Sequence, residues 1–197
     1  MTRKLRVRYE NACYHVYNRG VEKRLIFLDD LDRSTFMKML RTSLFDFGLK
    51  LFAYCLMDNH YHLFLQTPMA NLDKGMQNLQ GKYAQYFNLR HNRIGSLFQG
   101  RYKSKPVAKD NYALELVRYI HRNPSDNQND SRWLKYRWSS YLDYITSQPA
   151  VPYLDTEWVL KQFHQDSQSA AHLFIDFHNQ GPGGSGPFGI FDMAGKL

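Results

Sequence analysis

Two histidines separated by one residue, His60 and His62, carry the first chemistry that the sequence indicates. They lie in a run of aromatic and branched residues that predicts a β-strand over residues 60–66, and alternate residues of a strand point to the same face. Tyr61 and Leu63 are then expected in the opposite packing layer. Two imidazoles on one face can chelate a divalent ion, but such a pair also occurs as two hydrogen-bonded histidines without a metal. The spacing alone leaves both interpretations open.

A helix later in the chain supplies the other candidate groups. Residues 112–122 predict a helix that ends near Asn123, because Pro124 disfavours helical geometry in the residue before it. Tyr119 and Asn123 are four residues apart and share a face of this helix, with Glu115 one turn earlier. If the helix crosses the histidine strand, the amide oxygen of Asn123 becomes a third ligand, and Tyr119 is left as a nucleophile. A helical tyrosine is also common in a protein core, so this interpretation stays a hypothesis.

The candidate ligands favour one class of metal. They are imidazole nitrogens and an amide oxygen, and no cysteine lies near them in the sequence. A zinc site built from thiolates is therefore disfavoured. Magnesium or manganese suits work on phosphate groups better, because open positions on such an ion accept phosphate oxygens.

The elements that must position these groups alternate between strands and helices. Strands are expected at 12–18, 50–57, 60–66 and, as a short edge strand, before Pro106, and helices at 29–47, 71–90 and 112–122. Asp58 and Asn59 have the chemistry of a tight turn, so the second and third strands form a hairpin. This order predicts an α+β fold of the split βαβ, or ferredoxin-like, type: an antiparallel sheet with helices packed on it. Such a sheet can bring both histidines under the third helix.

The chain divides into a main domain and an extension. Residues 1–146 hold the predicted sheet, and the aromatic segment 133–144 is expected to pack back on its core. Residues 147–180 form a C-terminal helical extension, with short helices predicted at 155–164 and 167–178. The composition of 181–197, rich in glycine and proline, indicates a flexible tail.

Charge and aromatic content point to a polyanionic partner. Lys and Arg outnumber Asp and Glu by 26 to 18, the net charge is +8, and aromatic residues make up 15% of the chain. This combination suits nucleic acid, particularly single-stranded, although a merely basic soluble protein is the alternative. Arg101, Lys103 and Lys105 alternate onto one side of the predicted edge strand. They would contact phosphates there, or only keep a solvated edge from aggregating.

Cysteine usage and the N-terminus predict a cytoplasmic protein. Cys13 and Cys55 offer no CxxC pair and no disulfide framework, which fits a reducing compartment and two small buried side chains. The basic N-terminus is not followed by the apolar region of a signal peptide. No window approaches the ~18 apolar residues of a membrane-spanning helix.

Four segments form an ordered series of motifs. They are residues 14–20 (Tyr-His-Val-Tyr-Asn-Arg-Gly), 53–63 (Ala-Tyr-Cys-Leu-Met-Asp-Asn-His-Tyr-His-Leu), 97–102 (Leu-Phe-Gln-Gly-Arg-Tyr) and 119–124 (Tyr-Ile-His-Arg-Asn-Pro). In this order they resemble the motifs of the REP-associated tyrosine transposases, which are single-tyrosine members of the HUH endonuclease group. Residues 138–141 and 155–180 also resemble that family, so the resemblance spans about residues 3–180.

The resemblance implies a metal-dependent nuclease that cuts single-stranded DNA at or near a hairpin and stays joined to the 5′ phosphate. His60 and His62 would be the paired metal ligands, Asn123 the third ligand and Tyr119 the nucleophile. A 3′ hydroxyl would leave, and a second one could reverse the step and join strands. The residues expected to contact DNA are Arg3, Arg6, Arg19, Arg101, Lys103 and Lys105. A monomer is favoured, and a dimer stays open.

Three other functions are to be weighed against this one. A relaxase or a rolling-circle replication initiator also uses paired histidines and a tyrosine, but it usually has a third histidine or an acidic ligand. A non-catalytic hairpin-binding protein would keep the fold and lose site residues, whereas all four are present here. A metal hydrolase acting on a small molecule would leave the positive charge unexplained. The group that takes the phenol proton, Glu115 or a water molecule, is not assigned by the sequence.

Overall fold

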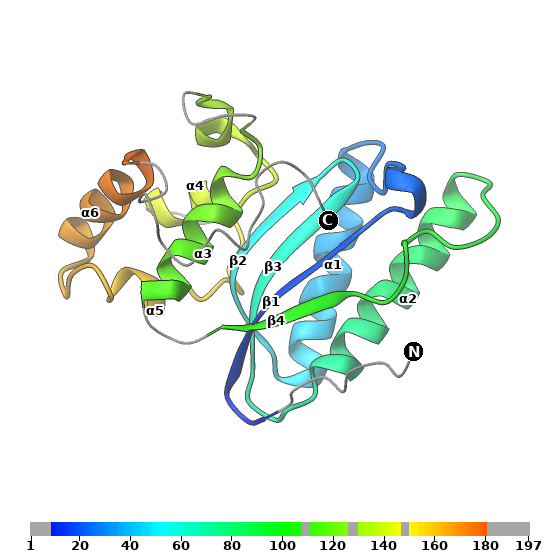
Figure 1. Cartoon of the computed structure of the whole chain (residues 1–197), viewed down its shortest axis with the longest axis horizontal. Coiled ribbons are helices and arrows are strands. Elements are labelled where there is room, and N and C mark those ends of the chain that lie inside the picture. The colour runs from blue at the N-terminus through cyan, green and yellow to red at the C-terminus, as the bar shows by residue number, and fades with distance from the viewer. Residues whose placement is uncertain (1–8, 108–110, 126–129, 147–149, 181–197) are drawn as a thin grey trace.

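Four antiparallel strands form a single sheet in the order β2-β3-β1-β4. The computed structural model of the chain describes residues 9–107, 111–125, 130–146 and 150–180. The strands are β1 (Ala12–Arg19), β2 (Lys50–Met57), β3 (His60–Thr67) and β4 (Lys103–Val107), shown in Figure 1. Arg3, Arg6 and the tail 181–197 lie outside the described residues. The short strand β4 is at the edge of the sheet, as predicted.

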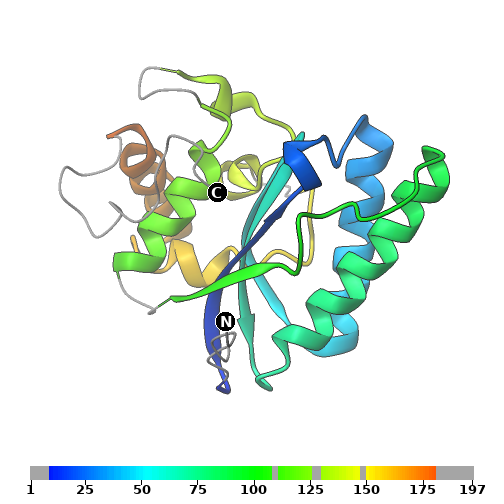
Figure 2. The same cartoon turned by 45° about the vertical axis from the view of Figure 1, so that its right-hand side comes forward.

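Helices cover both faces of this sheet. The helices are α1 (Asp30–Phe47), α2 (Leu72–Arg90), α3 (Asn111–Arg122), α4 (Tyr141–Ile145), α5 (Glu157–Leu160) and α6 (Ser167–Asn179), with short 3-10 helices at Val21–Lys23 and Arg132–Lys135. Figure 2 shows α1 and α2 together on one side of the sheet and α3 with the C-terminal helices on the other. The order of strands and helices along the chain confirms the predicted split βαβ fold.

Strand alternation sends side chains into two separate cores. On β3, Tyr61 and Leu63 are fully buried in the core under α1 and α2, as predicted from their alternation with the histidines. Phe64 faces the other way, into the core shared with α3 and the C-terminal helices. Cys13 and Cys55 are buried in this second core and are not joined in a disulfide, which confirms their prediction as small buried side chains.

The two ends of α1 are set by local sequence signals. Asp29 caps the N-terminus, since its side chain accepts a hydrogen bond from the backbone N–H of Asp32 at 3.0 Å. Gly48 ends the helix in the left-handed region, with φ of 61°, a conformation that glycine adopts without the strain a Cβ would bring. The helix predicted from Asp29 to Gly48 is therefore confirmed at both ends.

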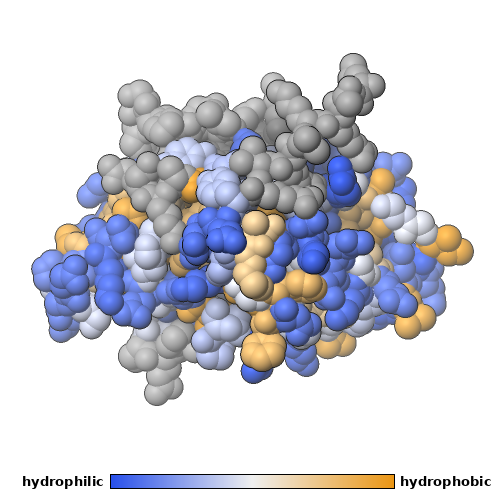
Figure 3. All heavy atoms as spheres, turned by 90° about the horizontal axis from the view of Figure 1, so that it is seen from below, coloured by the Kyte–Doolittle hydropathy of each residue, from blue (hydrophilic) through white to orange (hydrophobic). Residues whose placement is uncertain are grey.

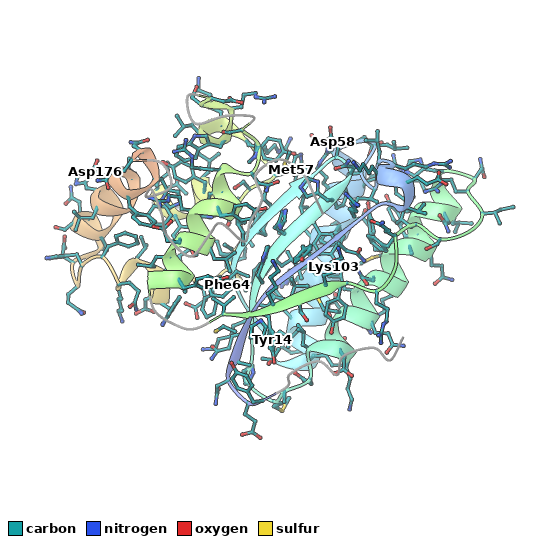
Figure 4. The ribbon with its side chains drawn as sticks, in the orientation of Figure 1. Tyr14, Met57, Asp58, Phe64, Lys103 and Asp176 are labelled. Carbon is teal, nitrogen blue, oxygen red and sulfur yellow. The ribbon has the colours of Figure 1, made fainter. Side chains whose placement is uncertain are left out.

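The turn between β2 and β3 is tied to the loop that precedes α1. The backbone carbonyl of Asp58 accepts hydrogen bonds from the N–H groups of Ile26 and Phe27, at 2.8 and 3.0 Å. The Asp58 carboxylate pairs with the guanidinium of Arg33 on α1. Figure 4 shows Asp58 at this turn. The start of β3, where His60 lies, is thus fixed from the opposite side of the sheet.

One helix of the extension is shorter than predicted. The helix expected over 155–164 is reduced to the single turn α5. The chain just before this turn is held against β2, where the Asp155 N–H donates to the Leu51 carbonyl at 2.8 Å. Leu154 forms a parallel bridge with Leu51 next to this contact. The second helix, α6, has nearly the predicted bounds. The aromatic segment before them packs as expected, with Trp133 and Tyr141 buried in the core that α3 shares.

The surface shows no large apolar area on the face seen in Figure 3. Hydrophilic side chains dominate this view, and apolar ones are scattered among them. Within the described parts of the chain, none of the helices combines the length and the apolar character needed to cross a membrane.

Candidate metal and nucleophile site

His60 and His62 lie side by side on the face of β3 that α3 covers. Their ring centroids are 5.1 Å apart and the rings are nearly perpendicular, at 86°. His62 is fully buried, whereas His60 is partly exposed. Burial lowers the pKa of His60 and holds the pKa of His62 well below its usual value. Both rings are therefore neutral at pH 7, the state in which an imidazole binds a metal.

Contacts of the turn orient the ring of His60. The side-chain amide of Asn59 donates to the carbonyl of Lys23 at 3.2 Å, which turns its Oδ1 toward Nδ1 of His60 at 2.7 Å. The proton of the neutral imidazole is then on Nδ1, and Nε2 carries a lone pair. That nitrogen lies 3.0 Å from Oδ1 of Asn123. Two acceptor atoms face each other, an arrangement that a cation stabilises.

The geometry fits a divalent ion with octahedral coordination. Ligand atoms ~2.1 Å from such an ion and at right angles to each other are ~3.0 Å apart, which is the observed separation of His60 Nε2 and Asn123 Oδ1. His62 Nε2 is buried and has no hydrogen-bond partner among the described residues. No group of three or more His, Cys, Asp or Glu side chains suited to a metal occurs in the described part of the chain. A metal site at this point would therefore need the predicted third ligand, the amide oxygen of Asn123.

Tyr119 lies over the histidines, one helical turn before Asn123. Its ring meets those of His62 and His15 edge-on, with centroids 5.5 and 5.9 Å away. Burial raises the pKa of Tyr119 to about 12, with a smaller increase from Tyr17, and a hydrogen bond with Asn123 partly opposes the rise. The side chain stays partly exposed. The structure thus brings the predicted nucleophile and the three predicted ligands together.

Glu115, the carboxylate considered as a proton acceptor, is engaged in an ion pair. It pairs with the guanidinium of Arg118, one turn along α3. Arg118 also donates to the backbone carbonyl of Phe177 at 3.0 Å, and its guanidinium lies 4.2 Å from the centre of the Phe177 ring. Glu115 therefore stabilises the side of α3 that faces α6.

Helix α6 holds α3 in position over the sheet. Arg122 donates to the carbonyl of His178 at 2.7 Å and stacks on Trp133, 5.2 Å from the ring centre. The rings of His121 and His178 share a buried hydrogen bond of 3.0 Å. Nε2 of His121 lies 2.8 Å from the hydroxyl of Ser140, which also accepts from the Tyr54 N–H of β2. These contacts flank Asn123 and fix the C-terminal end of α3.

The structure adds two residues of β1 that the sequence interpretation left without a role. His15 and Tyr17 lie on the same face as the paired histidines, and Tyr17 is directly opposite His62 in the β1–β3 register. Nε2 of His15 is 2.8 Å from Nδ1 of His62. The sequence shows that His15, Tyr17 and Arg19 alternate along one strand. It does not show how β1 aligns with β3, because strand register depends on contacts between distant segments.

A basic hollow opens beside these strands. It has a volume of about 220 Å³ and is lined by Tyr17, Asn18, Arg19, Gln99, Gly100, Arg101 and Lys103. Arg19 donates to the Gln99 side chain at 2.7 Å, and the Lys103 ammonium lies 5.8 Å from the centre of the Tyr17 ring. Figure 4 shows Lys103 on the edge strand β4. Lys105 is opposite His15 on the same strand, deeper in the sheet. Four of the six predicted DNA contacts thus cluster next to the histidines.

Comparison with known proteins gives a family and a fold. A family model described as "Transposase IS200 like" matches residues 8–123. No curated protein matches the sequence. One solved structure, a REP-associated tyrosine transposase bound to a REP hairpin, superposes with a TM-score of 0.63 at 13% identity, covering 79% of this chain and 93% of that one. A candidate transposase from Deinococcus radiodurans gives a TM-score of 0.43 at 21% identity, covering 61% and 97%.

Proposed function

Because the chain belongs to the IS200-like transposase family, we propose that it cleaves and rejoins single-stranded DNA at or near REP-like hairpins through a covalent 5′-phosphotyrosine. The observation that carries this proposal is the convergence of His60, His62, Asn123 and Tyr119 on one point of the sheet. The fold shared with a transposase that was solved on a REP hairpin supports DNA of that class as the substrate.

The proposed reaction uses a divalent ion, Mg²⁺ or Mn²⁺. Nε2 of His60, Nε2 of His62 and Oδ1 of Asn123 would hold it, and when bound it would polarise the scissile phosphate and orient it for in-line attack. Asn123 has a second task, because its hydrogen bond with Tyr119 links the nucleophile to the ligand set. The spacing of four residues on α3 makes this link possible.

Tyr119 performs the covalent step. Its phenol oxygen forms a bond to phosphorus while the bond between phosphorus and the 3′ oxygen breaks, and the proton lost by the phenol is balanced by the one gained by the leaving 3′ hydroxyl. The phenol is neutral at pH 7, since its pKa is raised to about 12, so it is deprotonated during attack and not before. The product keeps a phosphodiester bond. A second 3′ hydroxyl can therefore reverse the step and join strands.

The basic hollow gives the DNA strand a path to this site. Arg19, Arg101 and Lys103 line it, and Tyr17 offers an aromatic face on which an unpaired base can stack. The Tyr17 ring centre is 5.8 Å from that of His62, so a nucleotide in the hollow lies next to the metal ligands. The family's DNA-processing activity accounts for this basic surface, which a hydrolase of small molecules leaves unexplained.

The proposed catalytic unit comprises residues 1–146, and the described part of the extension 147–180 braces α3. A single chain supplies every group of the proposed site, which supports a monomer. We propose a cytoplasmic location from the sequence, as a separate expectation. Light scattering after size-exclusion chromatography tests the monomer. A dimer that persists at nanomolar concentration and loses cleavage when dissociated contradicts it.

A covalent adduct tests the proposed reaction. Labelled single-stranded DNA with a hairpin and unpaired flanks is incubated with the protein and Mn²⁺, and a denaturing gel should show a protein-linked fragment. Tyr119→Phe should abolish the adduct, whereas the control Tyr112→Phe, on the same helix, should retain it. An adduct that persists in Tyr119→Phe removes this nucleophile. Hairpin binding without any adduct in the wild type favours the non-catalytic hairpin-binding protein.

A further inference from the structure

A third histidine, His15 on β1, contacts His62, the deeper of the two histidines proposed as metal ligands. Nε2 of His15 lies 2.8 Å from Nδ1 of His62, and the two rings are nearly parallel, with centroids 5.0 Å apart and planes at 21°. His15 is paired with Phe64 across the β1–β3 ladder, so it reaches His62 diagonally on the same face. Both rings are fully buried, with 1% and 0% of their surface exposed.

The position of the proton between the two rings determines whether Nε2 of His62 carries a proton or a lone pair. One of the two facing nitrogens must donate and the other accept, since two lone pairs repel each other. If His62 accepts at Nδ1, its own proton is on Nε2. That nitrogen is buried and has no hydrogen-bond partner among the described residues, so the proton would be an unsatisfied buried donor. If His62 donates from Nδ1 to His15, its Nε2 keeps a lone pair that a cation can use, and the proton of His15 is on its own buried Nδ1. The metal position of the proposed function requires this second arrangement.

We propose that His15 is a positioning residue, which holds His62 as the Nδ1–H tautomer and aims the lone pair of Nε2 at the metal position. This inference rests on the metal site of the proposed function. His60 is oriented in an equivalent way from the turn, where Asn59 accepts the Nδ1 proton. Each proposed histidine ligand thus has its own acceptor, one in the turn and one on the neighbouring strand. Such partners commonly change metal affinity by ~10- to 100-fold.

Measurements of metal affinity distinguish a positioning role of His15 from a role in packing alone. Mn²⁺ binding to the whole protein, measured by electron paramagnetic resonance of the free ion, should weaken by ~10-fold or more in His15→Leu, which fills space but accepts no proton. His15→Gln, whose side-chain oxygen can accept from Nδ1, should recover most of the affinity. The control Phe64→Leu perturbs the packing beside His15 without removing the hydrogen bond, and it should bind Mn²⁺ like the wild type. Equal affinity in His15→Leu and wild type overturns the inference.

The tautomer of His62 can be measured in the metal-free protein. A long-range ¹H–¹⁵N spectrum of the metal-free protein should show His62 protonated at Nδ1 in the wild type, and this state should lose its dominance in His15→Leu. A proton on Nε2 in the wild type overturns the inference, whatever the metal affinities are. A wild type that binds no Mn²⁺ overturns the metal site of the proposed function instead. The spectrum still decides whether His15 sets the tautomer, so the two failures are distinguishable.

Discussion

Removing Arg101 and Lys103 together should weaken binding of single-stranded DNA by roughly 25-fold at about 0.1 M salt. Both side chains are exposed at the rim of the basic hollow, and neither forms an ion pair with another described residue. The double variant Arg101→Ala/Lys103→Ala therefore removes two charges that are available to phosphates. It breaks no contact that holds the fold together.

The magnitude follows from counterion release. Each phosphate contact on single-stranded DNA contributes a slope of ~0.7 to the dependence of log K on log salt, so two contacts contribute ~1.4. At about 0.1 M salt this corresponds to ~1.4 decades of affinity, and at about 0.3 M to ~0.7 decade, or roughly 5-fold. Fluorescence anisotropy with a labelled oligonucleotide, titrated at several salt concentrations, measures both the affinity and the slope.

The chain offers a matched control on the other side of the sheet. Lys38 and Arg41 are exposed on α1, so Lys38→Ala/Arg41→Ala removes one lysine and one arginine with the same change in net charge. Charges further from the DNA than the Debye length of ~8 to 10 Å contribute little. The control should keep the wild-type slope. Equal losses in the two double variants would refute the assigned DNA path and leave only a general effect of net charge.

Three further predictions concern the scaffold of the site. Gly20→Ala should destabilise the fold by ~1 to 3 kcal/mol in thermal denaturation, because its Cβ would lie 2.0 Å from the carbonyl oxygen of Arg24; wild-type stability contradicts this. Tyr83→Phe should cost ~1 to 3 kcal/mol in urea unfolding, since it removes a buried hydrogen bond of 2.6 Å to the Ile26 carbonyl; a change within experimental error contradicts it. Burial lowers the pKa of His178 to about 3 in the native state, whereas the pKa of a histidine in the unfolded chain is ~6.5. As the pH falls below ~6.5, the unfolded chain therefore binds a proton that the native state does not, and stability is lost. Protonation of His178 in the unfolded chain should lower the free energy of unfolding by about 2 kcal/mol between about pH 7 and pH 5. The variant His178→Gln should lose correspondingly less stability in unfolding experiments at the two pH values.

Local periodicity predicted much of the site's framework. The alternation around His60 and His62 gave the face that they share, the Asp58-Asn59 pair gave the hairpin, and a spacing of four residues gave the common face of Tyr119 and Asn123. These features depend on neighbours in the chain, for which strand and helix periods are reliable guides.

The contacts that His15 and Arg122 make with distant segments were not predicted. His15 reaches His62 across 47 residues, and the pairing register that allows this is set by the packing of the whole sheet. The anchoring of Arg122 by the last turn of α6 spans 56 residues. The contact of Asp155 with Leu51 of β2, just before α5, also joins segments far apart in the chain.

The proposed reaction bonds Tyr119 to DNA at the site formed with His60, His62 and Asn123. Trypsin cleaves after Arg118 and Arg122, so digestion of the adduct after nuclease treatment should release the tetrapeptide 119–122 carrying a nucleotide, identified by mass spectrometry. The nucleotide should appear on this tetrapeptide in the wild type, and no nucleotide-bearing peptide should appear in His62→Ala. A nucleotide attached to another tyrosine, such as Tyr17 in the hollow, would contradict it.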